Sequence, residues 1–184
     1  MDEGWKEAQL AQQLDPREER LEPALGNRRE YDQEIQHETS MMKVDPDSVM
    51  VHGGLFEGYL GKGMYKEAVE QWAQMLVMAG FPKDAAEVRQ AFARSGSRGA
   101  WRQTTEMFEH LQATNQLNMP INLASFYVLA GNRDRAFYWL DQACKSRGHA
   151  TGVSVVFLSR EPGLEPLRSD PRYKDLLRRV GLPA

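Results

Sequence analysis

The sequence predicts an all-α protein, an α-solenoid of stacked helix–turn–helix repeats closed by a C-terminal capping helix. Three observations lead to this prediction. Four residues recur in the same order 68 positions later: Leu55, Tyr59, Gly63 and Ala68 return as Leu123, Tyr127, Gly131 and Ala136. Sixty-eight is twice the roughly 34-residue length of a common helical repeat. Apolar residues also follow a 3–4 spacing over residues 65–79, the period of a helix with one buried face.

Turn and proline signals divide the predicted single domain, residues 1–184, into repeats. With 184 residues and 41% apolar content, the chain is long enough to bury such a short stack. The predicted segments are a half repeat (1–16), a degenerate repeat (17–46), a repeat (47–82), a diverged repeat (83–117), a repeat (118–148) and a C-terminal cap (149–184).

Residues 3–14 predict a helix that ends at Asp15-Pro16, because proline disfavours helical geometry in the residue before it. This helix corresponds to the second half of a repeat whose first half is absent. We therefore expect that the chain begins within a unit or is a fragment of a longer protein. The missing neighbour would leave apolar side chains exposed, with Trp5, Leu10 and Leu14 as candidates.

The degenerate repeat contains a predicted helix that starts near Tyr31 and stops before Asp45-Pro46. Glu34 occupies a position where the repeat needs a small alanine, and Glu38 one that needs a large apolar residue. Two carboxylates one turn apart on an inward face cost free energy. We expect this segment to be the least stable part of the stack.

The repeat at 47–82 has the clearest pattern. Its first helix runs to about Gly61 with Leu55 and Tyr59 on the inner face, and Gly80-Phe81-Pro82 ends the second. The second helix follows Gly63, and its predicted buried stripe is Tyr65, Ala68, Val69, Trp72, Met75, Leu76 and Ala79.

The diverged repeat keeps the spacing of the first helix through Val88, Phe92 and Gly96. Ser97-Arg98-Gly99 then adds three residues, which we expect to widen the turn. In the second helix the positions of Ala68, Trp72 and Met75 are taken by a corresponding set: Thr104, Phe108 and Leu111.

The last repeat starts with Pro120 in the first turn and places Ala136, Phe137, Leu140, Ala143 and Cys144 along its second helix. The final helix has complete boundary signals: Asp170 as N-cap, Pro171 at the first helical position and Gly181 as a left-handed C-terminal residue before Pro183. Its apolar stripe is Tyr173, Leu176, Leu177 and Val180. We interpret it as a lid over the end of the stack.

Two segments, Gly-Met-Tyr-Lys-Glu-Ala at 63–68 and Ala-Gly-Asn-Arg-Asp-Arg-Ala-Phe-Tyr-Trp-Leu at 130–140, resemble tetratricopeptide repeats (TPR). Residues 166–183 are similar to the C-terminus of bacterial TPR proteins. In that group the array often follows an effector domain: a winged-helix DNA-binding domain, a nucleotide cyclase or a serine/threonine kinase. The resemblance implies an α-solenoid whose concave face binds a protein or peptide.

The resemblance also implies which residues face that concave groove: Met50, Glu57, Leu60, Asn118, Asn122 and Ser125. The matching positions lack the lysine–asparagine set with which some family members clamp a C-terminal carboxylate. We therefore expect a peptide to be recognised by shape and hydrogen bonds. The four tryptophans offer a second aromatic surface, but Trp72 falls on the core stripe, whereas Trp139 lies off its stripe.

The net charge of −3 and the pI near 5.9 argue against a dedicated nucleic-acid binder. Residues 1–47 carry a balance of −7, residues 48–144 are balanced, and residues 145–184 carry +4. We interpret both ends as solvated helix faces in preference to head-to-tail contacts. The sequence shows no signal peptide and no membrane-length apolar run, and its one cysteine, Cys144, fits a buried hydrophobe. A cytoplasmic protein without a membrane partner is the expectation.

No catalytic, cofactor or metal constellation emerges, because the four histidines lie in different units and no histidine or cysteine pair has ligand spacing. The predicted function is non-catalytic protein–protein interaction. The main alternative is a regulatory or sensory C-terminal module of a larger bacterial effector. Self-association through the N-terminal half repeat and a small enzyme are further alternatives.

Overall fold

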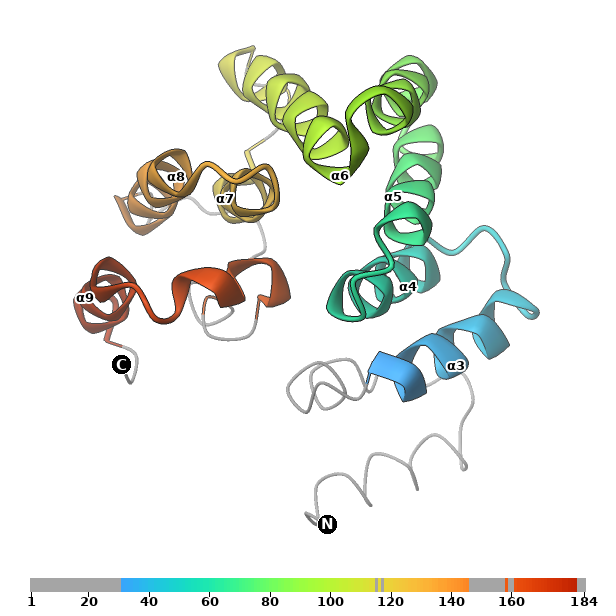
Figure 1. Cartoon of the computed structure of the whole chain (residues 1–184), viewed down its shortest axis with the longest axis horizontal. Coiled ribbons are helices and arrows are strands. Elements are labelled where there is room, and N and C mark those ends of the chain that lie inside the picture. Colours follow the sequence, from blue (N-terminus) through green and yellow to red (C-terminus); the bar gives the residue numbers. More distant parts are fainter. Residues whose placement is uncertain (1–30, 115, 117, 146–157, 159–160, 182–184) are drawn as a thin grey trace. The chain divides into compact units, whose positions relative to one another are not determined.

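The computed structural model describes residues 31–114, 116, 118–145, 158 and 161–181, and this part of the chain is helical without a β-strand (Figure 1). Its elements are α3 (Tyr31–Met42), α4 (Val49–Gly61), α5 (Tyr65–Met78), α6 (Pro82–Ala113), α7 (Pro120–Leu129), α8 (Arg133–Lys145), the 3₁₀-helix η2 (Pro162–Leu167) and α9 (Pro171–Arg179). The predicted all-α class is confirmed. The helix predicted at 3–14, with its three apolar candidates, lies outside the described residues.

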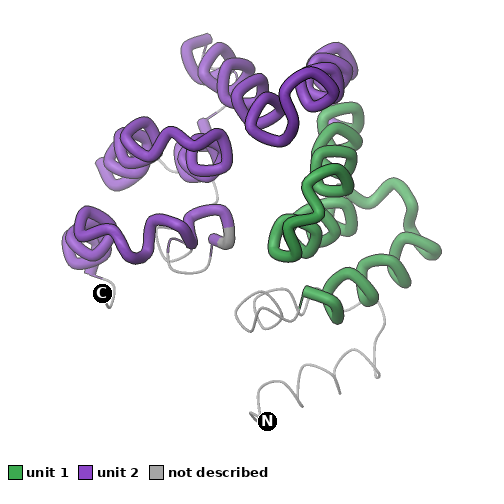
Figure 2. The backbone as a smooth tube through the Cα atoms, in the orientation of Figure 1, with its two compact units in different colours: residues 1–78 green, residues 79–184 purple. Residues whose placement is uncertain are grey.

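The chain divides into two compact units, Met1–Met78 and Ala79–Ala184 (Figure 2). In the first unit α4 packs against both α3 and α5. In the second unit α7 packs against α6, α8 and η2, and α8 also contacts α9. Within the described residues no helix combines the length and the apolar character that crossing a bilayer requires.

The matching glycines of the sequence repeat close two turns of the same geometry. Gly63 and Gly131 have φ of +70° and +83°, in the left-handed region that glycine enters without a Cβ clash. In each turn the amide after the glycine donates to the tyrosine carbonyl of the preceding helix, at 2.9 Å for Tyr59 and 2.8 Å for Tyr127. The repeated leucines and alanines are at most 2% exposed in both copies. The sequence repeat therefore corresponds to a repeat of local structure.

A stripe of glycines lets α4 approach α3 closely. Gly54, Gly58 and Gly61 are four and three residues apart, so they share one face of the helix. A Cβ added at any of the three would collide with the side chain that it faces on α3, which is Glu38, Ile35 and Tyr31 respectively. The contact between the two helices therefore depends on the absence of side chains on α4.

Two carboxylates of α3 lie on its buried face, as predicted. Glu34 is 1% exposed and Glu38 is 3% exposed. The Nδ1 atom of His37 lies 3.3 Å from Glu38 Oε1, at the edge of this face. The expected low stability of the segment remains a prediction.

The turn predicted to be widened within α6 is instead narrow, so that prediction was wrong. The chain breaks only at Gly96, with φ of +66° and ψ of −164°, and Ser97-Arg98-Gly99 already belong to the following helical segment. The three extra residues lengthen this second segment because helical geometry satisfies their backbone groups better than an open loop. The predicted inward residues Thr104, Phe108 and Leu111 are buried.

The predicted stripe of α5 is correct in the middle and wrong at the ends. Tyr65 is 47% exposed and Ala79, beyond the last helical residue, is also exposed, whereas Ala73 is fully buried. Side chains at helix ends have fewer neighbours to cover them. Trp72 is half-buried, with its ring centroid 5.9 Å from that of Phe56.

The other described tryptophans do not form an exposed strip. Trp101 is 1% exposed and packs 6.0 Å from the Phe126 ring in the core of the second unit. Trp139 is half-buried, and its indole nitrogen is enclosed. The Trp101 ring is therefore part of the core, and the Trp139 ring contacts Tyr138 of its own helix, 5.2 Å between ring centroids.

The C-terminal helix begins and ends as predicted. The side chain of Asp170 accepts a hydrogen bond from the Arg172 amide at 3.0 Å, Pro171 is the first helical residue, and Gly181 has a φ of +79°. Tyr173, the first member of its stripe, is 2% exposed, and its hydroxyl donates to the carbonyl of Leu158.

Two ion pairs align α9 with α8. Arg172 contacts Asp134 at 2.8 Å, and Arg179 contacts Asp141 at 2.6 Å. The two aspartates are seven residues apart, as are the two arginines, so the pairs meet in the same order along both helices. This order requires α8 and α9 to run parallel. Arg172 and Arg179 of the basic tail are thus paired within the unit.

Candidate functional site

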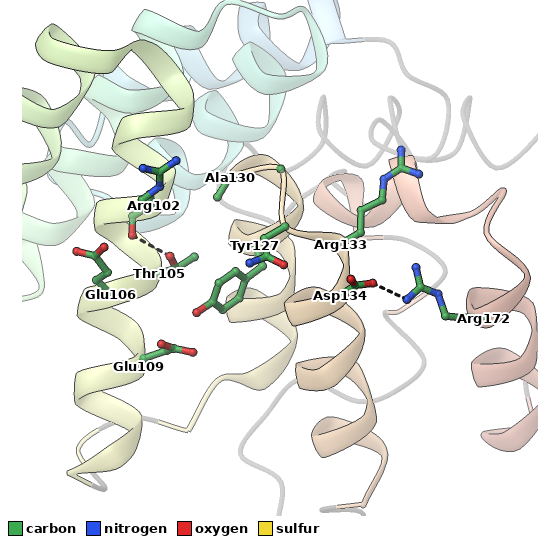
Figure 3. Close-up of a pocket in the computed structure, with 11 residues that line it drawn as sticks. Arg102, Thr105, Glu106, Glu109, Tyr127, Ala130, Arg133, Asp134 and Arg172 are labelled. Carbon is green, nitrogen blue, oxygen red and sulfur yellow. Dashed lines mark hydrogen bonds and ion pairs between the residues drawn. The ribbon is translucent and has the colours of Figure 1, made fainter.

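A pocket of about 790 Å³ opens in the second unit between α6, α7, α8 and α9. Side chains from the second half of α6 face the end of α7 and the beginning of α8 across it (Figure 3). Its lining is Arg102, Thr105, Glu106, Glu109, Tyr127, Ala130, Gly131, Asn132, Arg133, Asp134 and Arg172. Six of these eleven residues carry a charge, so the pocket is a polar site.

Glu109 and Tyr127 form one wall together with Arg135 behind them. Arg135 makes an ion pair with Glu109, and its guanidinium carbon lies 5.5 Å from the centre of the Tyr127 ring. Burial alone would raise the pKa of Glu109, but hydrogen bonds from Tyr127 and Arg135 outweigh it and lower the pKa. Burial and the bond to Glu109 raise the pKa of the Tyr127 hydroxyl. At neutral pH the Glu109 carboxylate is therefore ionised and already bonded to Arg135 and Tyr127.

The aromatic side chains around Arg135 hold the guanidinium in place. Its carbon lies 4.8 Å from the ring centre of Tyr138 and 5.9 Å from that of Trp139. These separations are within the range of cation–π attraction. Arg135 is therefore a structural cation that positions Glu109 at the pocket.

The opposite wall contains a second set of paired charges. Arg172 donates to Asp134 and to Asp170, at 2.8 Å in each case, and lies 4.0 Å over the ring centre of Phe137. The hydrogen bonds with these carboxylates raise the pKa of Arg172. They likewise lower the pKa of Asp170. This wall is fixed in charge throughout the physiological range.

Three charged lining residues remain without an ion pair in the described part of the chain: Arg102, Glu106 and Arg133. All three are exposed. Arg133 is the first residue of α8, whose N-terminus also adds a positive partial charge to the pocket. Asn132 caps this helix, its Oδ1 accepting from the Arg135 amide at 3.1 Å. The pocket thus presents two available guanidinium groups and one available carboxylate.

The predicted groove residues are divided between the two units. Met50, Glu57 and Leu60 lie on α4, where Met50 is 46% exposed and the other two are half-buried. Asn118 precedes α7 and is exposed, and it accepts a hydrogen bond from Gln112 at 3.4 Å. The assignment of these residues to a groove remains a prediction.

Two of the predicted groove residues on α7 are less accessible than expected. Asn122 is half-buried, and its Oδ1 atom is enclosed without a hydrogen bond among the described residues. Ser125 is only 6% exposed, because η2 packs over it, and its hydroxyl donates to Ile121 O at 3.2 Å. Ser125 therefore packs against η2 in this structure, and its assignment to a groove remains a prediction.

The sequence did not indicate the pocket residues, because the family resemblance implies a binding face built only from the first helix of each repeat. The pocket is lined mainly by the helices that follow them, at α6 and α8. A signal was present in the run Arg133-Asp134-Arg135 directly after the Gly131 turn, and in the carboxylates Glu106 and Glu109 one turn apart. Neither pattern indicates a pocket until the two helices are brought together.

The charged and polar groups that line the pocket can form ion pairs and hydrogen bonds with a ligand. The described residues contain no cluster of three side chains able to hold a metal ion. No protein-family model matches this chain, and no curated protein or solved structure is significantly similar to it.

Proposed function

We propose that this chain is a non-catalytic protein-binding module, built as a TPR-like α-solenoid. In this proposal the second-unit pocket binds an extended segment of a partner protein that carries an acidic side chain. The observation that supports it most directly is the pair Arg102 and Arg133, which line the pocket without an ion pair in the described residues.

The dimensions and charge of the pocket suit a short peptide segment. A volume of about 790 Å³ lies within the ~300–1,000 Å³ typical of ligand sites. A carboxylate beside either arginine would form charge-assisted hydrogen bonds, which are stronger than neutral ones. The N-terminus of α8 would add a favourable dipole.

Glu106 indicates which side chain should stand next to the acidic residue of the partner. It lies four residues after Arg102 on the same face of α6, and it has no ion pair in the described residues. A basic or hydrogen-bond-donating side chain next to the partner's acidic residue would therefore be favoured. A purely acidic tract would be repelled at this point.

The solenoid part of the proposal is supported by the local repetition. The two turns at Gly63 and Gly131 have the same hydrogen bonding, and each is followed by a helix that packs on the one before it. The parallel course of α8 and α9 is also typical of equivalent helices in adjacent repeats. Such arrays commonly serve as binding surfaces.

The proposal is tested with a displayed random-peptide library selected against the intact chain, followed by fluorescence anisotropy with the enriched peptides. We expect these peptides to contain an aspartate or glutamate. The variant Arg102→Glu/Arg133→Glu should weaken binding at least about tenfold, because two charge-assisted contacts are lost. The control Arg94→Glu reverses an exposed charge on α6 outside the pocket and should change affinity less than about twofold.

A third variant, Asn118→Ala/Asn122→Ala, separates the pocket from the predicted groove. Loss of binding there, with affinity retained in the arginine variant, would contradict the pocket assignment and favour the groove. A library that enriches no peptide at all would contradict the protein-binding function.

A further inference from the structure

A third arginine, Arg98, extends the positive charge of the pocket. Arg98 lies one helical turn before Arg102 on the same face of α6, and both side chains are exposed. A Cβ built at Gly131 would lie 3.9 Å from Arg98 Nε, so the Arg98 side chain reaches from α6 to the turn before α8. Arg102, Gly131 and Arg133 line the pocket itself. Three arginines, two from α6 and one from α8, therefore lie around this turn, and we call them the basic end of the pocket.

The nearby carboxylates do not neutralise the basic end. Figure 3 shows Arg102 and Glu109 at opposite ends of the pocket. Glu109 forms its ion pair with Arg135, and Asp134 forms its own with Arg172 at 2.8 Å. The positive and negative charges of the pocket are therefore separated, and these two carboxylates are already bonded.

The arginines of the basic end make no ion pair within the described part of the chain. Arg133 also acts electrostatically on Asp170, but that carboxylate pairs with Arg172 at 2.8 Å. Like charges one turn apart on a helix repel each other, as Arg98 and Arg102 do here. An anion bound beside them would relieve this repulsion.

A phosphoryl group matches three arginines better than a carboxylate does. A phosphorylated side chain carries about −1.5 to −2 charges at pH 7 and three strong acceptor oxygens. A carboxylate has a single negative charge and two oxygens. Each guanidinium group can donate two parallel hydrogen bonds to phosphate oxygens. The N-terminus of α8 adds backbone amides and a dipole that also favour phosphate.

We propose that the basic end binds the phosphoryl group of a phosphorylated serine, threonine or tyrosine in the partner segment. This inference rests on the proposed protein-binding function and specifies the acidic side chain of the partner. Glu106, Glu109 and Asp134 line the same pocket, so a chain of successive phosphates would meet carboxylates on either side. A single phosphoryl group avoids them. The pocket therefore suits a phosphorylated protein better than a nucleic acid.

The basic end is tested first with phenyl phosphate and benzoate, titrated separately into the ¹⁵N-labelled intact chain and followed by NMR. Phenyl phosphate should shift the Gly131 amide signal and bind at least about fivefold more tightly than benzoate. Arg98→Gln should weaken phenyl phosphate binding at least about fivefold. The control Arg94→Gln removes an exposed charge of α6 outside the pocket and should change it less than about twofold. Equal affinities for the two compounds, or equal losses in the two variants, would overturn the proposal.

The partner is tested with two degenerate peptide pools that differ only at one central position, which is phosphoserine or glutamate. The phosphoserine pool should bind the intact chain at least about tenfold more tightly, and Arg98→Gln should remove most of this difference. Equal binding of the two pools would overturn this proposal alone and leave the protein-binding function standing. Binding of neither pool would contradict both. A short oligothymidylate that displaces phenyl phosphate at lower phosphate concentration than the phosphoserine pool would overturn the proposal in favour of a nucleic-acid site.

Discussion

At the scale of single residues, the contact between α3 and α4 depends on glycines of α4, which have no Cβ atom at the contact. A Cβ at Gly58 would lie 2.7 Å from Ile35 Cγ1, closer than packed carbon atoms approach. Glycine inside a helix costs about 1 kcal/mol relative to alanine. The close approach of the two helices offsets that cost.

Replacing Gly58 by alanine should therefore destabilise the first unit despite the better helix propensity. Overpacking costs about 1–3 kcal/mol, and the propensity gain returns at most about 1 kcal/mol. The net loss, up to about 2 kcal/mol when the full propensity gain is subtracted, is measurable by urea unfolding followed by circular dichroism. In an Ile35→Ala background the same substitution should become neutral or stabilising. A loss of equal size in both backgrounds would show that the contact with Ile35 is not the cause.

Glu109 gives a residue-scale prediction for pH. Its pKa is lowered in the folded state, so its contribution to stability is present above the ordinary value of 4.5 and is lost as the pH falls through the folded pKa. Glu109→Gln should reduce stability by about 1 kcal/mol or less at pH 7, since the ion pair is partly exposed. Thermal melts should show the difference shrinking toward pH 3. Glu106→Gln, at a carboxylate without an ion pair among the described residues, is the control, and an equal effect there would contradict the role of the Arg135 ion pair.

At the scale of helices, the break in α6 depends on one residue. Gly96 has φ of +66° and ψ of −164°, a region that only glycine populates freely. Gly96→Ala should cost about 1–3 kcal/mol. Ser97→Ala, in the next helical turn, should change stability by no more than about 0.5 kcal/mol. Chemical denaturation of both variants checks this, and similar values for the two would contradict the strain argument.

Helix ends with local chemical signals could be predicted from the sequence, and those without them could not. Asp170, Pro171 and Gly181 specify the last helix through interactions among neighbouring residues, so its limits were predicted correctly. Ser97-Arg98-Gly99 carries turn-forming residues but is helical. Its conformation depends on the packing that follows along α6, and such packing overrides local preference.

At the scale of the whole molecule, the titrating groups of the second unit predict a stability maximum in weak acid. The lowered pKa values of Glu109, Asp141 and Asp170 make stability fall on acidification. Burial raises the pKa of Glu161, and this makes stability fall on alkalinisation. Melting temperatures between pH 3 and 8 should therefore peak just above pH 4.5. Glu161→Gln should flatten the alkaline limb alone.

The all-α class was predictable because helical periodicity is a local property, repeated along Leu55, Tyr59 and their counterparts. The pocket was not, because it requires the faces of α6 and α8 to be known relative to each other. Arg102 and Arg133 are 31 positions apart, and nothing in their local sequence specifies that they line one cavity. The burial of Ser125 was not predictable for the same reason, since the segment that covers it comes from η2.

Asp134 and Asp141 on α8 have the same seven-residue spacing as Arg172 and Arg179 on α9. This shared spacing limits the position of α9 along the axis of α8. If α9 slid forward by one turn, Arg172 would face the aromatic residues after Asp134, and Arg179 would face the end of the helix. Such a shift would break both ion pairs at once, because the two aspartates and the two arginines have the same spacing. The two ion pairs together therefore fix the axial register of α9 along α8.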